Sequence, residues 1–212
     1  MFVAQLWRYP VKSMGGEQLE RCHITADGIP GDRVVHVEDR QRKVVTSRSR
    51  PRLLLHRARL GDHGEPLVDE RAWGDPNVAA DVRAAAGKTA RLVRWTGPER
   101  FDVLPLLVAT DGALASLGYD ARRFRPNIIV GGVSGLTERS WEGRRLSVGE
   151  AVIEAVDLRQ RCIMTTFDPD TAEQNVEVLK RIHRELDGTF ALNCHVEKPG
   201  PVQVGDAVRL LD

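Results

Sequence analysis

The sequence predicts a mainly β protein with a few helices, and two observations lead to this prediction. Short runs rich in branched side chains recur along most of the chain, separated by turns that contain Gly, Pro or Asp. Only a few stretches carry the periodicity or the cap residues of helices. This spacing is typical of a barrel or sandwich, and we expect two closely packed strand-rich units.

The N-terminal unit is expected to contain six short strands and one helix. We place them at residues 3–11, 18–25, 33–38, 43–47, 53–60 and 89–95. The first helix is expected over Pro76–Ala86. Asp75 is a suitable cap, Pro76 fits the first turn, and Gly87 can take a left-handed conformation that ends the helix.

The C-terminal unit combines strands with two helices. Strands are expected at residues 103–109, 127–133, 145–148, 151–158, 189–197 and 202–210. A short helix over 111–117 should end at Gly118. A longer amphipathic helix is expected over 172–186, with an apolar face formed by Val176, Leu179, Ile182, His183 and Leu186.

Composition limits the class of partner. The 212 residues include 31 basic and 30 acidic side chains, so no global field favours nucleic acid or an anionic membrane. Any anion site must be a local cluster, which indicates a small-molecule ligand. The chain opens directly into a strand pattern and has no apolar run of membrane-spanning length, so we expect a cytoplasmic protein. Three widely separated cysteines favour reduced thiols over disulfides.

The segment 161–171 contains the most informative residue pair. Cys162 directly follows Arg161 and precedes a polar turn. A thiolate is the reactive and metal-binding form of cysteine, and a neighbouring guanidinium stabilises it. Most single intracellular cysteines are instead small buried apolar residues, and local spacing alone leaves that alternative open.

With its surroundings, this segment resembles the molybdenum-cofactor sulfurase C-terminal (MOSC) family, within the group that includes the mitochondrial amidoxime-reducing component. The similar motifs, in chain order, are Tyr9-Pro10-Val11-Lys12-Ser13, Gly31-Asp32-Arg33, Val45-Thr46-Ser47-Arg48, Phe124-Arg125-Pro126-Asn127-Ile128-Ile129-Val130, the cysteine segment, and residues 199–208. Each motif is weak alone, but their order is specific and spans nearly the whole chain.

The resemblance implies a MOSC-type β-barrel fold and a cofactor. Residues 1–95 would form an N-terminal MOSC-associated β-barrel region and residues 96–212 the MOSC domain. The implied cofactor is a pyranopterin dithiolene carrying molybdenum, with Cys162 as the catalytic metal ligand, because a soft thiolate suits that metal. The implied cofactor-binding residues are Lys12, Ser13, Arg33, Thr110, Asp111, Gly112, Arg125, Asn127, Arg161, Cys162 and Asn193. Read without the resemblance, Lys12 and Arg33 are ordinary surface charges, and Asp111 is a helix cap.

Several other sites are disfavoured by the pattern. Cys22-His23 and Cys194-His195 lie in expected strands, where neighbours face opposite sides, so each pair offers at most one ligand to zinc. His183 is expected to be a core or boundary residue. Dinucleotide, phosphate-loop and hydrolase signatures do not occur, and the four tryptophans are scattered in a way that indicates packing.

The resemblance implies an oxidoreductase that reduces N-hydroxylated compounds. The chain has no cysteine run able to hold an iron–sulfur cluster, so electrons are expected from a separate reductase or ferredoxin-like protein. Two alternatives remain: sulfur transfer through a Cys162 persulfide, and a cofactor carrier without turnover. Asn193 replaces an aromatic residue of the amidoxime-reducing relatives, and the segment between Thr171 and Phe190 is shorter, so their substrate preference does not transfer.

Overall fold

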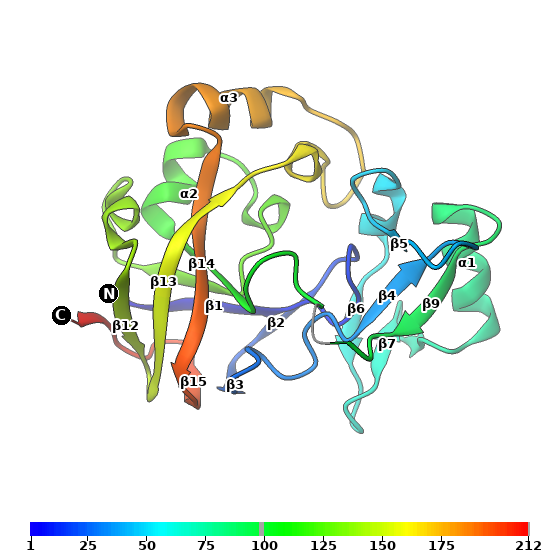
Figure 1. Cartoon of the computed structure of the whole chain (residues 1–212), viewed down its shortest axis with the longest axis horizontal. Helices are drawn as coiled ribbons and strands as arrows, with labels where there is room; N and C mark the ends of the chain where they lie inside the picture. The colour runs from blue at the N-terminus through cyan, green and yellow to red at the C-terminus, as the bar shows by residue number, and fades with distance from the viewer. Residues whose placement is uncertain (98–99, 212) are drawn as a thin grey trace.

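The computed structural model describes residues 1–97 and 100–211 and confirms the mainly β prediction. Figure 1 shows two parts side by side, a large curved sheet with two helices and a smaller group of short strands with one helix. The large sheet has eight strands in the order β16-β12-β13-β14-β10-β11-β1-β2. Its strands span Phe2–Arg8 (β1), Glu17–Leu19 (β2), Leu106–Thr110 (β10), Ile128–Gly131 (β11), Arg144–Val148 (β12), Ala151–Gln160 (β13), Thr189–Lys198 (β14) and Val208–Leu211 (β16).

The large sheet curls so that its N-terminal strand meets the C-terminal segment. The amide of Val3 donates to the carbonyl of Asp206 (2.9 Å), and the amide of Gly205 donates back to the carbonyl of Val3 (2.8 Å). A separate antiparallel pair joins β3 (Arg21–Ile24) to β15 (Gly200–Gln203). Inside the curl, branched side chains from both halves of the chain form one apolar core around Trp141. The two termini therefore lie at the same end of the molecule (Figure 1).

The smaller part contains two three-stranded sheets and α1 (Pro76–Ala86). One sheet has the order β5-β4-β9, with strands Val44–Val45, Val35–Glu38 and Arg91–Arg94, and the other consists of β6 (Ala58–Leu60), β7 (Pro66–Val68) and β8 (Arg71–Ala72). Val78, Val82 and Ala86 on one face of α1 pack into a second core with these strands. As expected, Asp75 caps this helix by accepting from the amide of Asn77.

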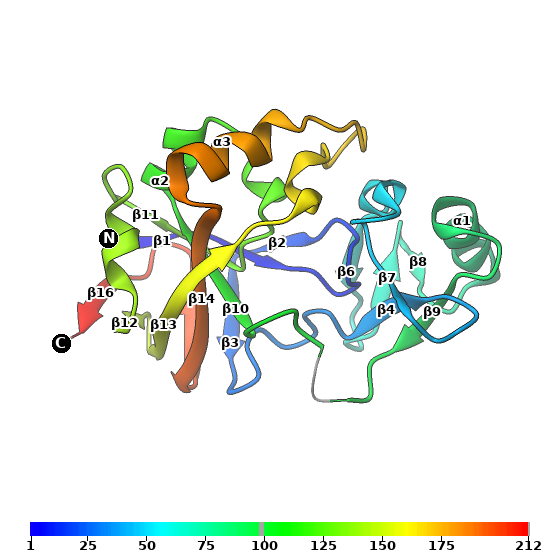
Figure 2. The same ribbon diagram turned by 45° about the horizontal axis from the view of Figure 1, so that its top comes forward.

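The other two α-helices cover one side of the large sheet (Figure 2). They are α2 (Asp111–Leu117) and α3 (Glu177–Leu186), and they enclose a third core with Phe124 and Phe190. Short 3-10 helices lie at Pro51–Leu55 (η1), Ala121–Arg123 (η2), Thr137–Trp141 (η3) and Ile163–Thr166 (η4). Among the described residues, no helix combines the length and apolarity needed to cross a membrane.

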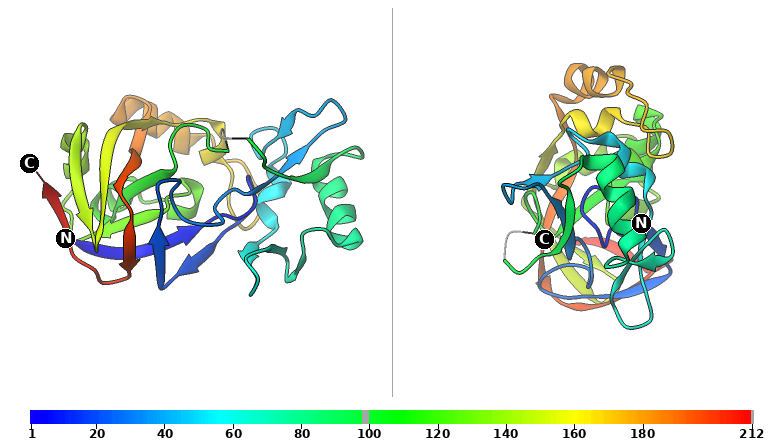
Figure 3. Two further views of the ribbon diagram at one scale, coloured as in Figure 1. Left: turned by 60° about the horizontal axis from the view of Figure 1, so that its bottom comes forward. Right: turned by 90° about the vertical axis from the view of Figure 1, so that its right-hand side faces the viewer.

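Strand pairing links the two halves of the sequence. β1 pairs antiparallel with β11, and β3 pairs with β15, so the first strands of the chain belong to sheets completed by its second half. Figure 3 shows these N-terminal strands extending along the large sheet before the chain enters the smaller part. The division between residues 95 and 96 stays a prediction, and the site described below draws residues from both sides of it.

The structure corrects several element boundaries. Residues 53–60, expected as one strand, form the end of η1 followed by β6, because the chain turns at Leu55–Arg57. The expected strands 18–25 and 202–210 are each split, into β2 and β3 and into β15 and β16. The two-residue strand β8 and its partner β7 were not expected at all. Gly87 has a positive φ of 116°, but its ψ of 154° lies outside the left-handed helical region that was expected.

The amphipathic helix is shorter than predicted and is rotated about its axis. Before α3, Asp168 accepts from the amides of Asp170 and Thr171 in a turn, Ala172 adopts a φ of 58°, and Gln174 forms an isolated bridge with Phe167, so the helix begins only at Glu177. The buried face is Val178, Ile182 and Leu186. Val176 and His183 are exposed, so the assignment of His183 to the core or its boundary is wrong.

Candidate functional site

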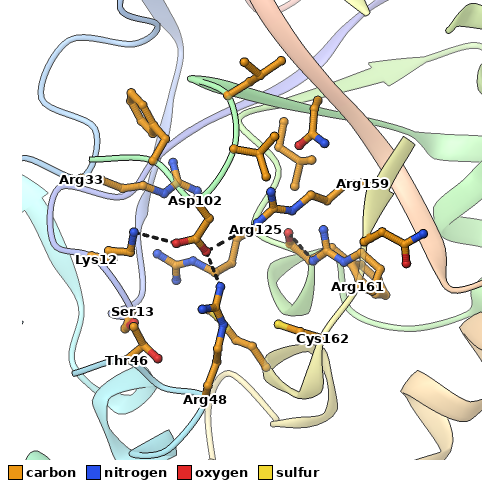
Figure 4. Close-up of a pocket in the computed structure, with 18 of the residues that line it drawn as sticks. Lys12, Ser13, Arg33, Thr46, Arg48, Asp102, Arg125, Arg159, Arg161 and Cys162 are labelled. Atoms are coloured by element: carbon orange, nitrogen blue, oxygen red, sulfur yellow. Dashed lines mark hydrogen bonds and ion pairs between the residues drawn. The ribbon is translucent and has the colours of Figure 1, made fainter. Parts of the chain in front are cut away.

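A pocket opens between the large sheet and the smaller strand group, and it contains most of the residues singled out from the sequence. Figure 4 shows charged side chains from several separate segments pointing into it. Of the predicted site residues, the pocket is lined by Lys12, Ser13, Arg33, Arg125, Asn127, Arg161, Cys162 and Asn193. The remaining polar and charged lining residues are Thr46, Arg48, Asp102, Arg123, Arg159 and Gln160. Within the described part of the chain, the lining thus contains seven basic side chains and one carboxylate.

Three of the lining residues have a backbone conformation that side chains usually avoid. Ser13, Arg33 and Arg125 have φ values of 72°, 53° and 56°. Such left-handed conformations are uncommon outside glycine, and they concentrate at functional sites, where the surrounding structure compensates their cost. They lie in the turn after β1, the turn before β4, and the segment between η2 and β11. Each tight turn directs a polar side chain into the same pocket.

Arg125 is a buried cation and Arg161 a half-buried one, and both lack complete hydrogen bonding. Arg125 donates to the carbonyl of Met14 and stacks 4.1 Å from the Tyr9 ring centroid, and Arg161 donates to the carbonyl of Phe124 (2.9 Å). Burial lowers the pKa of each guanidinium to about 10, so both remain charged at neutral pH. Arg125 Nη2 and Arg161 Nε are buried without a hydrogen-bond partner among the described residues. Unpaired buried donors are costly, which indicates that an acceptor belongs in this pocket.

Asp32 is a buried anchor behind the pocket wall. Its carboxylate accepts from the Tyr9 amide (2.7 Å) and from Asn127 Nδ2 (3.1 Å), and it pairs with the Arg33 guanidinium. Asn127 also donates to the Trp7 carbonyl and accepts from the Leu107 amide. The amide of Asn127 is thus occupied by protein groups. Its role here is to join three segments of the wall, while Arg33 remains directed at the cavity.

Asp102 occupies the middle of the basic cluster, and sequence analysis missed it. Its carboxylate lies 2.7 Å from Lys12 Nζ, 2.5 Å from Arg48 and 3.5 Å from Arg159 (Figure 4). Burial alone would raise its pKa, but these three cations together hold the pKa below its usual range. Asp102 and Arg159 belong to no motif, so no sequence signal pointed to them. Arg48 stood in a quoted motif without an assigned role.

Cys162 is the half-buried thiol of this pocket. It directly precedes η4, and its carbonyl accepts from the amide and hydroxyl of Thr165 (3.1 and 3.0 Å). Burial would lower the pKa of Arg48, but the neighbouring Asp102 and Cys162 side chains raise it. The guanidinium of Arg48 therefore lies near the thiol, and it comes from a separate segment of the chain (Figure 4). The sequence neighbour Arg161 turns to the Phe124 carbonyl instead.

The other two cysteines lie in the sheet core or at its border. Cys194 is completely buried on β14, and Cys22 packs against the same core from β3. Burial raises the pKa of the Cys22 thiol to about 11 and raises that of Cys194 further. Both thiols therefore stay protonated at neutral pH. Only Cys162 among the three lines the basic pocket.

Thr110, Asp111 and Gly112 do not line the pocket. Thr110 is buried, caps α2 by accepting from the Ala113 amide, and hydrogen-bonds to Glu138. The Asp111 carboxylate accepts from the backbone amides of Gly112, Gly132 and Val133, so its oxygens are already used. The helix cap is Thr110, so the alternative that made Asp111 the cap is wrong by one residue, and Asp111 is the first residue of α2. We carry none of the three residues into the proposed cofactor site.

Asn193 reaches the pocket from β14 and is held in place. Its Nδ2 donates to Asp157 on β13 at 2.6 Å, and its side chain is almost fully buried. Its position fits the expected edge of the site, but its amide is partly engaged with that carboxylate. Asn193 therefore shapes the wall where an aromatic residue would project further into the space.

The residues present fit a ligand that combines phosphate and a soft metal. A phosphate would satisfy the unpaired guanidinium donors, since arginine and lysine are its usual protein ligands. Cys162 offers a thiolate on the same wall, and thiolates suit metals already bound by sulfur. The donor set therefore matches the molybdenum cofactor, with Lys12, Arg33, Arg48, Arg125 and Arg161 on the anionic part and Cys162 at the metal.

Comparison with known proteins covers almost the whole chain. Residues 1–101 match the MOSC N-terminal beta barrel domain and residues 109–209 match the MOSC domain. The human protein "Mitochondrial amidoxime-reducing component 1" is 28% identical over 99% of this chain and 82% of its own length. "Molybdenum cofactor sulfurase" of Caenorhabditis elegans is 25% identical over 84% of this chain but only 30% of its own length.

A solved structure supports the fold. A crystal structure titled only as a hypothetical protein aligns over 98% of this chain and 67% of its own, with a TM-score of 0.52 and 13% identity. At that sequence identity, the similarity shows only that the two proteins share the same architecture. The ordered matches to both domains show that this chain belongs to the MOSC family, in the arrangement that places the MOSC N-terminal domain ahead of the MOSC domain.

Proposed function

We propose that this protein binds the molybdenum cofactor in the basic pocket and reduces N-hydroxylated compounds such as amidoximes and hydroxylamines. The observation that carries the proposal is the single thiol, Cys162, in a pocket lined by seven basic side chains, two of which have a buried guanidinium nitrogen without a hydrogen-bond partner among the described residues. Similarity to the human amidoxime-reducing component over nearly the full chain supports the reaction class.

The roles of the residues follow from their charge and position. Four basic side chains that line the pocket would hold the phosphate of the cofactor by charge-assisted hydrogen bonds. They are Lys12, Arg33, Arg48 and Arg125. Cys162 would supply a sulfur ligand to molybdenum. When bound, the cofactor supplies two-electron redox chemistry that no protein side chain provides. The protein contributes position, and its positive field stabilises a negatively charged ligand.

The proposed reaction consumes two electrons and two protons. The N–O bond of the substrate breaks, its oxygen leaves as water, and the nitrogen keeps its remaining substituents. A separate electron-donor protein, a reductase or a ferredoxin-like carrier, would return the two electrons after each turnover. Asn193 and Asp157 fix one wall of the pocket, so substrate size is set partly by this pair.

Expression in a host that makes the cofactor provides the test. The purified protein should contain about one molybdenum per chain, as expected for one thiolate ligand per pocket, and should reduce benzamidoxime with a reduced viologen dye as artificial donor. Cys22→Ser is the matched control for Cys162→Ser, because both remove one thiol and only Cys162 lines the pocket. Protein that folds but contains neither metal nor pterin would contradict the proposal.

Sulfur transfer is the second candidate, favoured by the similarity to the Caenorhabditis elegans molybdenum cofactor sulfurase. In this scheme the Cys162 thiolate takes the outer sulfur of a donor persulfide, which leaves as a thiolate. Cys162 would then give up that sulfur to a bound, reduced metal centre, which would supply the two electrons that convert it to sulfide, and Cys162 would return to a thiol. Mass spectrometry would find one extra sulfur on Cys162 after incubation with a persulfide donor. Cofactor-loaded protein that neither reduces benzamidoxime nor accepts sulfur would indicate a carrier.

A further inference from the structure

Among the described residues that line the basic pocket, Asp102 is the only carboxylate, and it joins cations from three separate segments. Lys12 follows β1, Arg48 follows β5, and Arg159 lies near the end of β13. All three contact the same side chain, at 2.7, 2.5 and 3.5 Å. Asp102 therefore occupies a position where cations from both parts of the molecule converge, which is the position that an anionic ligand would take.

The segment that carries Asp102 is held by contacts that can be exchanged. We call residues 100–104 the strap. Lys12 donates to the Arg100 carbonyl (3.2 Å), Arg100 donates to the Asp27 carbonyl (2.7 Å), and the Phe101 ring lies 5.8 Å from the Arg33 guanidinium. Val103 is half exposed, and the Asp102 side chain keeps 34% of its surface in solvent. Polar and cation–π contacts, more than apolar burial, hold these residues at the pocket.

We infer that the Asp102 carboxylate competes with anionic ligands for the cations of the pocket. It thereby lowers the affinity of the pocket for every anion, so that only ligands able to displace it bind. The inference rests on the proposed function only in requiring an anionic, phosphate-bearing ligand. Such a ligand must displace the Asp102 carboxylate to reach Lys12, Arg48 and Arg159. Its apparent association constant is then the intrinsic constant multiplied by the fraction of molecules in which Asp102 is released.

This competition distinguishes strong ligands from weak ones. A lone carboxylate or chloride ion replaces one anion by another and must also overcome the high effective concentration of a tethered group. A phosphate ester carries two charges and makes several charge-assisted hydrogen bonds, so it can displace Asp102. In the absence of ligand, Asp102 keeps three cations from facing one another unpaired.

Two probes with the same ring and different charge test the competition in metal-free, pterin-free protein. Phenyl phosphate is a dianion at pH 7.5, and benzoate is a monoanion. Calorimetric titration should show both binding about 10- to 100-fold more tightly to Asp102→Asn than to wild type, by similar factors. Asp170→Asn is the matched control. Asp170 also pairs with two arginines, Arg57 and Arg122, but lies outside the pocket, so its removal should leave both affinities unchanged.

Two results would overturn the inference. Unchanged affinities in Asp102→Asn would show that the carboxylate does not occupy the anion position. A gain for phenyl phosphate equal to the square of the gain for benzoate would show that Asp102 acts only through its long-range field, because that effect scales with ligand charge.

A crystal of the wild type soaked with phenyl phosphate gives a second test that does not depend on a folded variant. The ester should lie between Lys12 and Arg48, with Asp102 moved away from both. An ester bound beside an intact Lys12–Asp102 pair would contradict the inference. Failure of the proposed enzyme is distinguishable, because anion competition in metal-free protein is unaffected if the loaded protein lacks molybdenum or reductase activity.

Discussion

Replacing Arg125 by methionine should change the stability of the protein little while lowering its affinity for anions. Arg125 is almost fully buried, carries a charge and has no carboxylate partner among its hydrogen bonds. Burial lowers its pKa from 12.5 to about 10, which corresponds to about 3 kcal/mol lost by the charged form. The variant would recover this cost and lose the hydrogen bond to the Met14 carbonyl and the stacking on Tyr9.

The opposing terms are similar in size. A hydrogen bond from a charged group contributes about 1.5–3 kcal/mol, and a cation–π contact about 0.5–2 kcal/mol. We therefore expect the free energy of unfolding of ligand-free Arg125→Met to lie within about 2 kcal/mol of wild type. Breaking a buried ion pair would instead cost about 3–5 kcal/mol. Affinity for phenyl phosphate should nevertheless fall by at least about tenfold, because one charge-assisted contact is lost.

Thermal unfolding with and without phenyl phosphate measures both quantities in one assay, since a ligand stabilises only the state that binds it. Arg122→Met is the control, because Arg122 is ion-paired with Asp120 and Asp170 and does not line the basic pocket. A severe loss of stability in Arg125→Met with unchanged stabilisation by the ester would refute the reasoning. Arg125 would then be a structural residue, and its unpaired nitrogen would carry no functional meaning.

Three further predictions concern the thiols and the electron supply. Cys162→Ser should abolish benzamidoxime reduction, whereas Cys194→Ser should keep turnover and lower the free energy of unfolding by about 1–3 kcal/mol if the buried hydroxyl lacks a partner; equal activity losses measured in both would argue against a special role for Cys162. Burial raises the pKa of Cys22 to about 11, so between the ordinary thiol pKa and pH 11 the folded state keeps a proton that the unfolded state loses. Denaturant titrations should therefore show that the stability contributed by this residue falls as the pH rises through this range, and that Cys22→Ala removes this pH dependence. Purified protein should be inactive with NADPH alone and active with a reductase or ferredoxin-like protein, in a salt-sensitive manner, and robust turnover with NADPH and no second protein would exclude the proposed partner.

Local signals in the sequence were sufficient for the capped helices and for most strands. Asp75 and Pro76 define the start of α1, and Gly118 ends α2 in the left-handed conformation that was predicted. The boundaries failed where tertiary contacts decide the conformation. The Asp168 turn delays α3, and the short strands β7 and β8 exist because they pair with β6 and with each other, which no periodicity over two or three residues can indicate.

The candidate site was predictable only as far as its motifs reached. Lys12, Arg33, Arg125 and Cys162 come from separate motifs, and the structure places all four in one pocket. Adjacency in sequence misled the assignment of the thiol's partner, because Arg161 turns away to a carbonyl while Arg48 approaches from another segment. Asp102 carried no sequence signal, since a single aspartate in a connecting segment becomes informative only when three cations meet around it.

X-ray absorption at the molybdenum edge tests the central claim most directly. Wild type and Cys162→Ser would be purified from the same cofactor-producing host and compared after matching their metal content. If the Cys162 thiolate is a metal ligand, the wild-type spectrum should show one more sulfur neighbour than the spectrum of Cys162→Ser. In the variant, an oxygen neighbour should replace that sulfur. The same sulfur count in both proteins would contradict the account, because the thiol that lines the basic pocket would then not bind the metal.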